Sequence, residues 1–136
     1  MADMERYLPY LVNRGDRQQE YAFECTWNYF VTHFWRNIKP REIVKQFSYE
    51  RAKNKEITPM AAWTEIISTI KGCSHSFTRP GQCLPLEEYL QRSRNKFYGD
   101  PERRAIYEIF KQYEEWKRKS LHKTYDIMDL TNHLLR

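Results

Sequence analysis

The sequence predicts a mainly α-helical protein, a single compact domain of five or six helices with at most a short strand near the N-terminus. Three observations favour this fold class. Apolar residues recur at helical spacing, and proline stands just inside several predicted helix starts. The sequence has no repeat of fixed period, which argues against a solenoid. A chain of 136 residues supports one hydrophobic core rather than two. We expect residues 1–20 to form an N-terminal segment without a clear pattern and residues 21–136 to form the helical domain.

The first elements predicted are a turn, a short strand and an aromatic-rich helix. Pro9 breaks any helix in the first twenty residues, and residues 14–17 (Arg-Gly-Asp-Arg) have turn chemistry. Residues 21–24 predict the strand. The helix that follows begins at the N-cap Thr26 and ends before Pro40, and its large apolar side chains have helical spacing: Trp27, Phe30, Val31, Phe34, Trp35 and Ile38.

Three shorter helices are predicted in the middle of the chain. Residues 41–55 begin as a helix with Ile43, Val44 and Phe47 on one side, and then become basic and turn into a loop. Thr58 and Pro59 begin the second, which carries one apolar stripe to Gly72: Met60, Trp63, Ile66, Ile67 and Ile70. Residues 74–82 predict a loop, and Pro85 begins the third.

The clearest helix is predicted in the last third of the chain. Asp100 is its expected N-cap, Pro101 its first residue and Glu102 an acidic complement to the helix dipole, and its apolar stripe extends from Ile106 to Trp116. A basic turn is expected at residues 117–123. The final helix is expected to begin at the cap Asp126 and to direct three aliphatic residues to one side: Ile127, Leu130 and Leu134.

Composition limits the class of protein. No apolar run reaches the roughly 20 residues of a membrane helix, and the N-terminus lacks the apolar core of a signal peptide, so we expect an intracellular protein with no membrane partner. The three cysteines do not form a Cys-x-x-Cys motif and predict reduced, structural thiols. The net charge of +5 suits a polyanionic partner such as DNA or RNA, although acidic residues interrupt most basic groups, as on an ordinary solvated helix surface.

Residue patterns for catalysis are weak. The chain contains neither a Gly-x-x-x-x-Gly-Lys-Ser/Thr phosphate loop nor a Gly-x-Gly-x-x-Gly motif, so we expect no cofactor and no ATP binding by the chain alone. Cys73, His75 and Cys83 are the best candidate zinc ligands, with His122 or His133 as a distant fourth. The alternative is a buried Cys73 beside the end of a helix.

Two further candidates for acid–base chemistry also have simpler explanations. His33 lies among aromatic residues and fits a helix face better than a catalytic base. Asp126 and Asp129 have the spacing of a carboxylate pair, but a helix cap at Asp126 and a complement to the helix dipole at Asp129 explain them better.

Four segments in order resemble a known family: residues 63–72, 86–90, 103–113 and 125–130 (Trp-Thr-Glu-Ile-Ile-Ser-Thr-Ile-Lys-Gly, Leu-Glu-Glu-Tyr-Leu, Arg-Arg-Ala-Ile-Tyr-Glu-Ile-Phe-Lys-Gln-Tyr and Tyr-Asp-Ile-Met-Asp-Leu). They are similar to part of UvrD/Rep-like superfamily-one helicases, closest to the UvrD-like region of TPR and ankyrin repeat-containing proteins. The likeness covers about residues 21–135. Residues 39–57 depart from it by being longer and more basic.

The resemblance implies the helical accessory insertion (1B-type subdomain) of the first RecA-like half, either excised or retained as a stand-alone remnant. Such a domain is not an enzyme by itself. ATP and magnesium would belong to the motor of the parent helicase, whose motor domains are one expected partner and whose nucleic acid is the other.

The candidate phosphate contacts flank one predicted loop and one helix start: Arg92, Arg94, Lys96, Arg103 and Arg104. One alternative is that Arg103 and Arg104 only pair with Glu102 and Glu108. The alternative for the whole chain is a protein–protein docking or adaptor domain that binds no nucleic acid.

Overall fold

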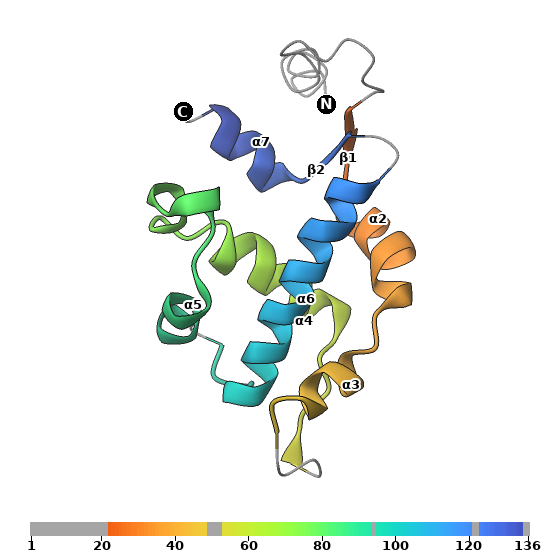
Figure 1. Cartoon of the computed structure of the whole chain (residues 1–136), viewed down its shortest axis with the longest axis vertical. Helices are drawn as coiled ribbons and strands as arrows, with labels where there is room; N and C mark the ends of the chain where they lie inside the picture. Colours follow the sequence, from red (N-terminus) through yellow and green to blue (C-terminus); the bar gives the residue numbers. More distant parts are fainter. Residues whose placement is uncertain (1–21, 49–52, 94, 121–122, 135–136) are drawn as a thin grey trace.

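The computed structural model describes residues 22–48, 53–93, 95–120 and 123–134. It is mainly helical with one two-stranded sheet, which confirms the predicted fold class (Figure 1). The predicted Pro9 break and the turn at residues 14–17 lie outside the described residues. In chain order the elements are β1 (Ala22–Glu24), α2 (Trp27–Tyr29), η1 (Phe30–Phe34), η2 (Trp35–Asn37), α3 (Pro40–Lys45), α4 (Pro59–Thr64), η4 (Glu65–Ile70), η5 (Ser76–Thr78), η6 (Pro80–Gln82), α5 (Leu86–Arg92), α6 (Asp100–Lys119), β2 (Lys123–Tyr125) and α7 (Ile127–Leu134).

The first helical run changes geometry along its length. Thr26 caps it as predicted, its hydroxyl oxygen accepting the Tyr29 N–H at 3.3 Å. One α turn is followed by the π-helical η1 and the 3₁₀ turn η2. This run buries Phe30 and Phe34, whose ring centroids each lie 5.5 Å from that of Tyr113 on α6. The aromatic anchors predicted from the spacing therefore do pack into the core.

The second run, α4 and η4, begins and ends as predicted. The Thr58 hydroxyl accepts the Ala61 N–H at 3.1 Å. At the end, a Cβ on Gly72 would lie 2.3 Å from the Ile67 carbonyl oxygen, so only glycine fits there without a shift. The predicted stripe is wrong at Met60, which is 52% exposed. The fully buried row is instead spaced by four residues, at Ala62, Ile66 and Ile70, and Met60 does not fall on it.

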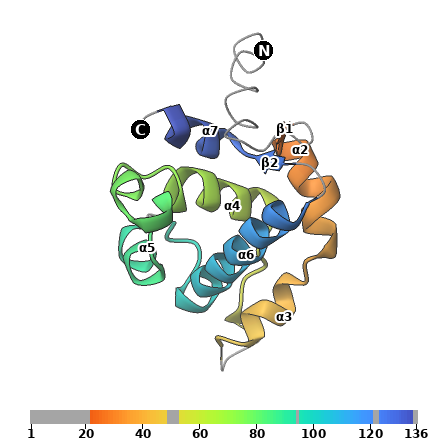
Figure 2. The same ribbon diagram turned by 45° about the horizontal axis from the view of Figure 1, so that its top comes forward.

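Helix α6 is the centre of the domain. Figures 1 and 2 show α2 and α3 on one side of it and α5 on the other. Its fully buried residues are those of the predicted stripe and one alanine: Ala105, Ile106, Ile109 and Tyr113. The single hydrophobic core is formed around this row.

Both ends of α6 differ from the prediction. Gly99, rather than Asp100, is the N-cap, because its carbonyl accepts the first helical hydrogen bond from the Arg103 N–H. Glu102 completes the cap by accepting the Gly99 N–H at 2.8 Å. The basic turn predicted from Lys117 is also wrong: α6 continues to Lys119 and Lys117 is buried. The reason is a set of carboxylates from elsewhere in the chain, described below.

The sheet joins the first described element to the segment that precedes α7. β1 and β2 pair in parallel, with Ala22 opposite Lys123, Phe23 opposite Thr124 and Glu24 opposite Tyr125. The strand at residues 21–24 was predicted, but β2 was not. β2 follows directly on residues predicted as a basic turn, and its partner β1 precedes all the described helices. Among the described residues, no helix is both long enough and apolar enough to span a bilayer.

Candidate functional site

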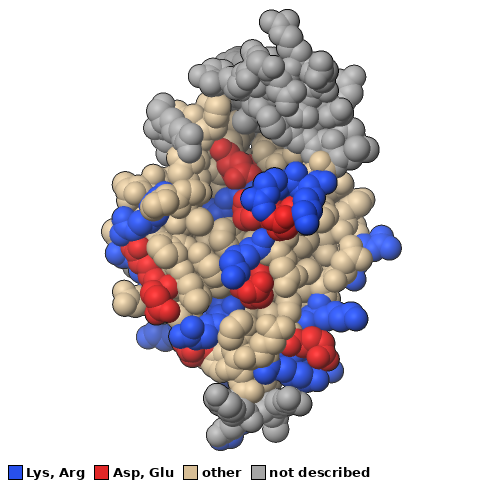
Figure 3. Space-filling model, in the orientation of Figure 1, with Lys and Arg blue, Asp and Glu red and all other residues tan. Residues whose placement is uncertain are grey.

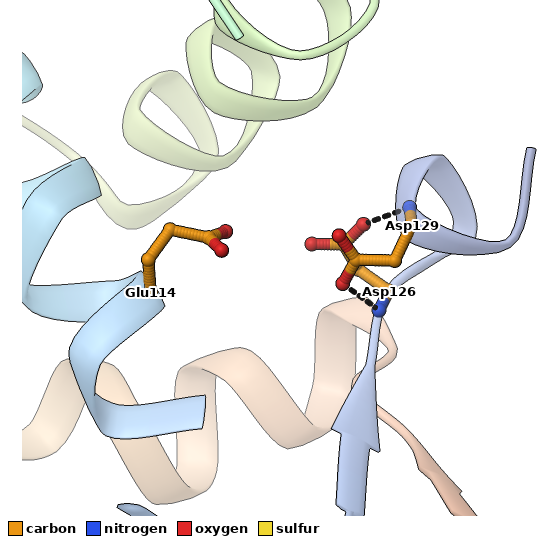
Figure 4. Close-up of side chains that lie close together, drawn as sticks. All are labelled: Glu114, Asp126 and Asp129. Atoms are coloured by element: carbon orange, nitrogen blue, oxygen red, sulfur yellow. Dashed lines mark hydrogen bonds between the residues drawn. The ribbon is translucent and has the colours of Figure 1, made fainter. Parts of the chain in front are cut away.

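Five charged residues from three parts of the chain meet between α6 and α7, where the two lysines and Asp126 are buried and the other two carboxylates are about a third exposed. We call them the buried charge cluster: Lys71, Glu114, Lys117, Asp126 and Asp129. Figure 4 shows its three carboxylates, with Glu114 on α6 facing the two aspartates at the start of α7.

Lys71 enters the cluster from the end of η4. Its ammonium nitrogen lies 2.7 Å from Asp126 Oδ2, 2.7 Å from Asp129 Oδ1 and 3.0 Å from Glu114 Oε2. These contacts use all three donors of an ammonium group. Lys71 itself is only 3% exposed, so its charge is balanced by the carboxylates rather than by water.

Lys117 reaches the same carboxylates from the last turns of α6. Its Nζ lies 3.0 Å from Glu114 Oε2, 3.0 Å from Asp126 Oδ2 and 2.5 Å from Asp129 Oδ2. The hydroxyl of Tyr113 also donates to Asp126 Oδ2, at 2.8 Å. Asp126 is fully buried, and its Oδ2 accepts from three donors.

The other oxygen of Asp126 begins helix α7. Asp126 Oδ1 accepts the backbone N–H groups of Met128 and Asp129, each at 2.9 Å, and Asp129 Oδ2 accepts the Asp126 N–H at 2.9 Å. This reciprocal arrangement confirms the predicted cap at Asp126. No local pattern indicated that the same two carboxylates also neutralise two buried lysines.

The electrostatics of the cluster keep Asp126 and Lys71 ionised. Burial would raise the pKa of the Asp126 carboxyl, but the charges of Lys71 and Lys117 outweigh burial and hold that pKa below its ordinary value. Burial would lower the pKa of Lys71, but the charges of Asp126, Asp129 and Glu114 raise it above its ordinary value. Burial, and then the charge of Asp126, raises the pKa of the Tyr113 phenol, which stays protonated as a donor.

The cluster is better suited to holding the fold together than to binding a metal ion. The three carboxylates offer oxygens within 4.8 Å of one another, which is the spacing of a cation site. Two ammonium groups already lie against these oxygens and supply the positive charge that a metal would bring. A cation would have to displace both buried lysines. We therefore assign the cluster a structural role that fixes α7 against α6 and η4.

The candidate zinc ligands do not come together in the structure. Within the described ranges, only Glu114, Asp126 and Asp129 place three ligand atoms close enough for a metal, so Cys73, His75 and Cys83 form no such group. His122 lies outside the described residues, and His133 is on α7. The three cysteines are free thiols. Burial raises the pKa of the Cys25 thiol to about 12, as expected for a structural cysteine.

His33 is an exposed residue of η1. This agrees with the prediction that it lies on a helix face. Its ring stacks on Tyr29, with centroids 3.9 Å apart, and its Nδ1 lies 2.7 Å from the Thr32 hydroxyl. These local contacts account for the side chain without a substrate.

The predicted phosphate contacts lie around the connection from α5 to α6. Arg92 is exposed at the end of α5, but its Nε lies 2.9 Å from Glu88, which also accepts from Arg79 at 2.6 Å. Lys96 is exposed and makes no ion pair with any residue that the structure describes. Arg94 lies outside the described residues.

The two arginines at the start of α6 do not make the ion pairs that the alternative predicted. Arg104 pairs with Asp100 at 2.6 Å, so the alternative pairing with Glu102 and Glu108 is wrong for it. Those two glutamates are already engaged, Glu102 by backbone N–H groups and Glu108 by Lys111. The Nε of Arg103 is buried without a hydrogen-bond partner in the described part of the chain.

Surface charge is mixed rather than gathered into one basic area on the face drawn in Figure 3. Blue and red side chains alternate over that face, as the charge pattern of the sequence predicted. Electrostatic attraction of a polyanion would therefore depend on the few cations that lack carboxylate partners.

Comparison of the chain with models of known protein families, with curated proteins and with solved structures gives no match. The likeness to helicases therefore rests on the four segments of sequence and stays a prediction.

Proposed function

We propose that this chain is the non-catalytic helical accessory domain of a UvrD/Rep-like superfamily-one helicase, and that it contacts the phosphate backbone of DNA or RNA beside an ATPase motor. ATP and magnesium would be bound by the motor of the parent protein, which would act inside the cell. The proposal assigns no chemical step to the residues of this chain.

The observation that supports the proposal best is the parallel pairing of β1 with β2. Parallel strands need a crossover connection, and here the whole helical unit from α2 to α6 is that connection. Sheets made only of parallel strands occur almost entirely in α/β proteins with covered faces. A helical unit that leaves one strand and returns to a parallel neighbour is the geometry expected for an insertion into a RecA-like sheet.

Charge supports the contact with nucleic acid. The chain carries a net charge of +5, and Lys96 is exposed in the connection before α6 without an ion-pair partner among the described residues. Arg92 and Arg104 would bind phosphate only in competition with Glu88 and Asp100. Surface ion pairs of this kind contribute about 0–1 kcal/mol, so a phosphate could displace the carboxylates.

The second candidate function, a protein-docking or adaptor domain, has one observation in its favour. Ile127 and Leu134, two helical turns apart on α7, are 41% and 46% exposed. Only Leu130 among the three predicted apolar residues of this helix is buried. The face that α7 leaves open would suit a contact with the motor domains or another protein.

Titration of labelled single-stranded and forked DNA and RNA with the purified chain, followed by fluorescence anisotropy, tests the proposal. We expect binding at low salt that weakens strongly between about 50 and 200 mM salt. The combined variant Arg92→Ala, Arg94→Ala and Lys96→Ala should bind more weakly than wild type. A control with the same change of charge is Lys111→Ala, Arg118→Ala and Lys119→Ala, at exposed positions of α6. No binding of any of these nucleic acids at low salt would refute the proposal and favour the docking function.

A further inference from the structure

A cleft lies between α3 and residues 54–58, the segment that leads into α4. Its volume is about 850 Å³, within the ~300–1,000 Å³ range typical of ligand-binding clefts. Trp35, Val44 and Ile57 contribute apolar lining, and the last two are almost fully buried and so lie at its base. Four exposed cations surround this lining: Lys39, Arg41, Lys45 and Lys55. We call this hollow the α3 cleft.

Fewer of the cations around the α3 cleft are paired strongly with carboxylates than is the case for Arg92 and Arg104 among the predicted phosphate contacts. Lys39 and Arg41 make no ion pair with any residue in the described ranges. Lys55 contacts a ring rather than a carboxylate, with its Nζ 4.8 Å from the centroid of Phe97. Lys45 pairs with Glu42 at 3.3 Å, but both side chains are well exposed, so the pair is weak. Four cations face only two carboxylates, Glu42 and Glu56, in the lining.

Contacts with the rest of the fold hold both walls of the α3 cleft in place: hydrogen bonds hold one wall and apolar packing holds the other. The Lys55 N–H donates to Glu102 Oε2 at 3.0 Å, and the Tyr98 hydroxyl donates to the Glu56 carbonyl at 2.9 Å. On the other wall, α3 packs its buried Ile43 and Val44 into the core. A cleft fixed before binding loses less conformational entropy when a ligand enters.

We propose that the α3 cleft binds a stretch of single-stranded nucleic acid. Its phosphates would lie on the surrounding cations, and a base would rest against the ring of Trp35. The inference depends on the proposed function, whose nucleic-acid contact it assigns to a specific site. It also accounts for residues 39–57, the part of the chain that is more basic than the helicase resemblance predicts.

A single strand fits the α3 cleft better than a duplex. A base can reach apolar lining at the bottom of a hollow only after it leaves the double-helical stack. Aromatic side chains combined with unpaired cations are the arrangement by which proteins hold single strands without regard to sequence. Such binding depends strongly on salt because phosphate contacts release counterions.

The test compares variants in anisotropy titrations with a labelled oligonucleotide of about 16 nucleotides. The cleft variant is Lys39→Ala, Arg41→Ala and Lys55→Ala, and its control with matched charge is Lys111→Ala, Arg118→Ala and Lys119→Ala. All six positions are exposed or partly exposed lysines and arginines, so folding should be retained, which circular dichroism will check. We expect the cleft variant to bind about tenfold more weakly or worse, and its salt slope to fall by about 2 because three phosphate contacts are lost.

Tryptophan fluorescence gives an independent measurement of the same site. Trp35 is in the lining of the α3 cleft, whereas Trp27, Trp63 and Trp116 are not. A base stacked on Trp35 would quench its emission, so the quenching produced by oligonucleotide should disappear in Trp35→Phe. Quenching that persists unchanged in this variant would contradict a base at Trp35.

The outcomes separate this inference from the proposed function. If wild type binds single strands and the cleft variant and the control bind equally well, the α3 cleft is not the site, although the proposed function survives. If wild type binds no nucleic acid, both fail. A polyglutamate peptide that displaces the labelled strand as well as unlabelled strand does would show a general polyanion site and overturn the assignment to nucleic acid.

Discussion

The ammonium nitrogen of Lys71 lies 2.7 Å from a carboxylate oxygen of Asp126, although the two residues are 55 positions apart in the chain. Lys71 follows η4 and Asp126 precedes α7, so this contact joins the end of one helix to the start of the other. Of the large aliphatic residues of α7, Ile127 and Leu134 remain exposed and Leu130 is buried. Charge pairing therefore acts together with the packing of Leu130 to hold α7 in position.

Replacing Lys71 with methionine should strongly destabilise the protein. Lys71→Met keeps the length of the side chain but leaves three carboxylates facing only the ammonium group of Lys117. Removing one partner of a buried ion pair typically costs about 3–5 kcal/mol. Urea denaturation should show this loss in the free energy of unfolding. Lys111→Met is the control, because Lys111 is 60% exposed and pairs only with Glu108 on the surface, and it should change stability by about 0.5 kcal/mol or less.

The buried charge cluster should make stability depend on pH at both ends of the scale. The pKa of Asp126 is lower in the folded protein than in the unfolded chain. Its contribution is therefore complete above the unfolded value of about 4 and is lost as the pH falls towards the folded pKa. The pKa of Lys71 is raised on folding, so its contribution is complete below about 10.4 and is lost as the pH rises through the folded value.

Asp126→Asn isolates the acid limb of this dependence. Asparagine keeps the N-cap of α7, since it caps helices about as well as aspartate, but it removes the charge. The variant should be less stable than wild type at neutral pH and should lose less further stability on acidification from about pH 5 to pH 2. Urea titrations at several pH values measure both effects. Parallel acid profiles for the two proteins would mean that Asp126 does not supply the acid dependence.

Gly72→Ala should destabilise the protein more than Gly99→Ala. At Gly72 the new methyl group would meet the backbone carbonyl oxygen of Ile67 at 2.3 Å, so η4 or its neighbours must shift. At Gly99 it would lie 3.1 Å from Glu102 Oε1, a side-chain atom, so a smaller shift would relieve the contact than at Gly72. We expect a loss of about 1–3 kcal/mol at Gly72 and a smaller one at Gly99. Thermal unfolding of the two variants under one buffer condition gives the comparison, and equal melting temperatures would contradict it.

The three thiols should react with alkylating reagents at different rates. Cys25 is 1% exposed, and burial raises its thiol pKa to about 12, so at neutral pH almost no reactive thiolate is present. Cys73 and Cys83 are partly exposed. Iodoacetamide followed by mass spectrometry of peptides should therefore label these two before Cys25 in the folded protein. Labelling of all three at similar rates in urea serves as the control, and early labelling of Cys25 without urea would contradict its burial.

Local sequence signals predicted most of the helices correctly. Thr26, Thr58 and Asp126 were identified as caps, and each does accept a backbone N–H within the next three residues. Gly72 was identified as a helix end, and the close approach of the Ile67 carbonyl explains why. These features are readable because capping and helix termination involve residues that are neighbours in the chain.

Interactions between distant residues were missed. Lys117 was assigned to a basic turn because no local pattern shows that Asp126 and Asp129 fold back onto it. β2 was not recognised, and its partner β1 precedes all the described helices. The α3 cleft was likewise unpredicted, since its cations are distributed over residues 39–55 among acidic ones. The structure shows that Arg92 and Arg104 have carboxylate partners. The role of the five predicted phosphate contacts in binding nucleic acid stays a prediction.

The sequence by itself therefore determined that this protein is helical, where most helices begin and end, and many of the residues that fill its core, because periodicity and capping are local properties. Only the tertiary structure decided that two lysines are buried against three carboxylates, that β1 and β2 pair in parallel, and which cations remain unpaired on the surface. Such contacts depend on where distant segments meet, and charge pairing across the fold leaves no periodic pattern in the chain.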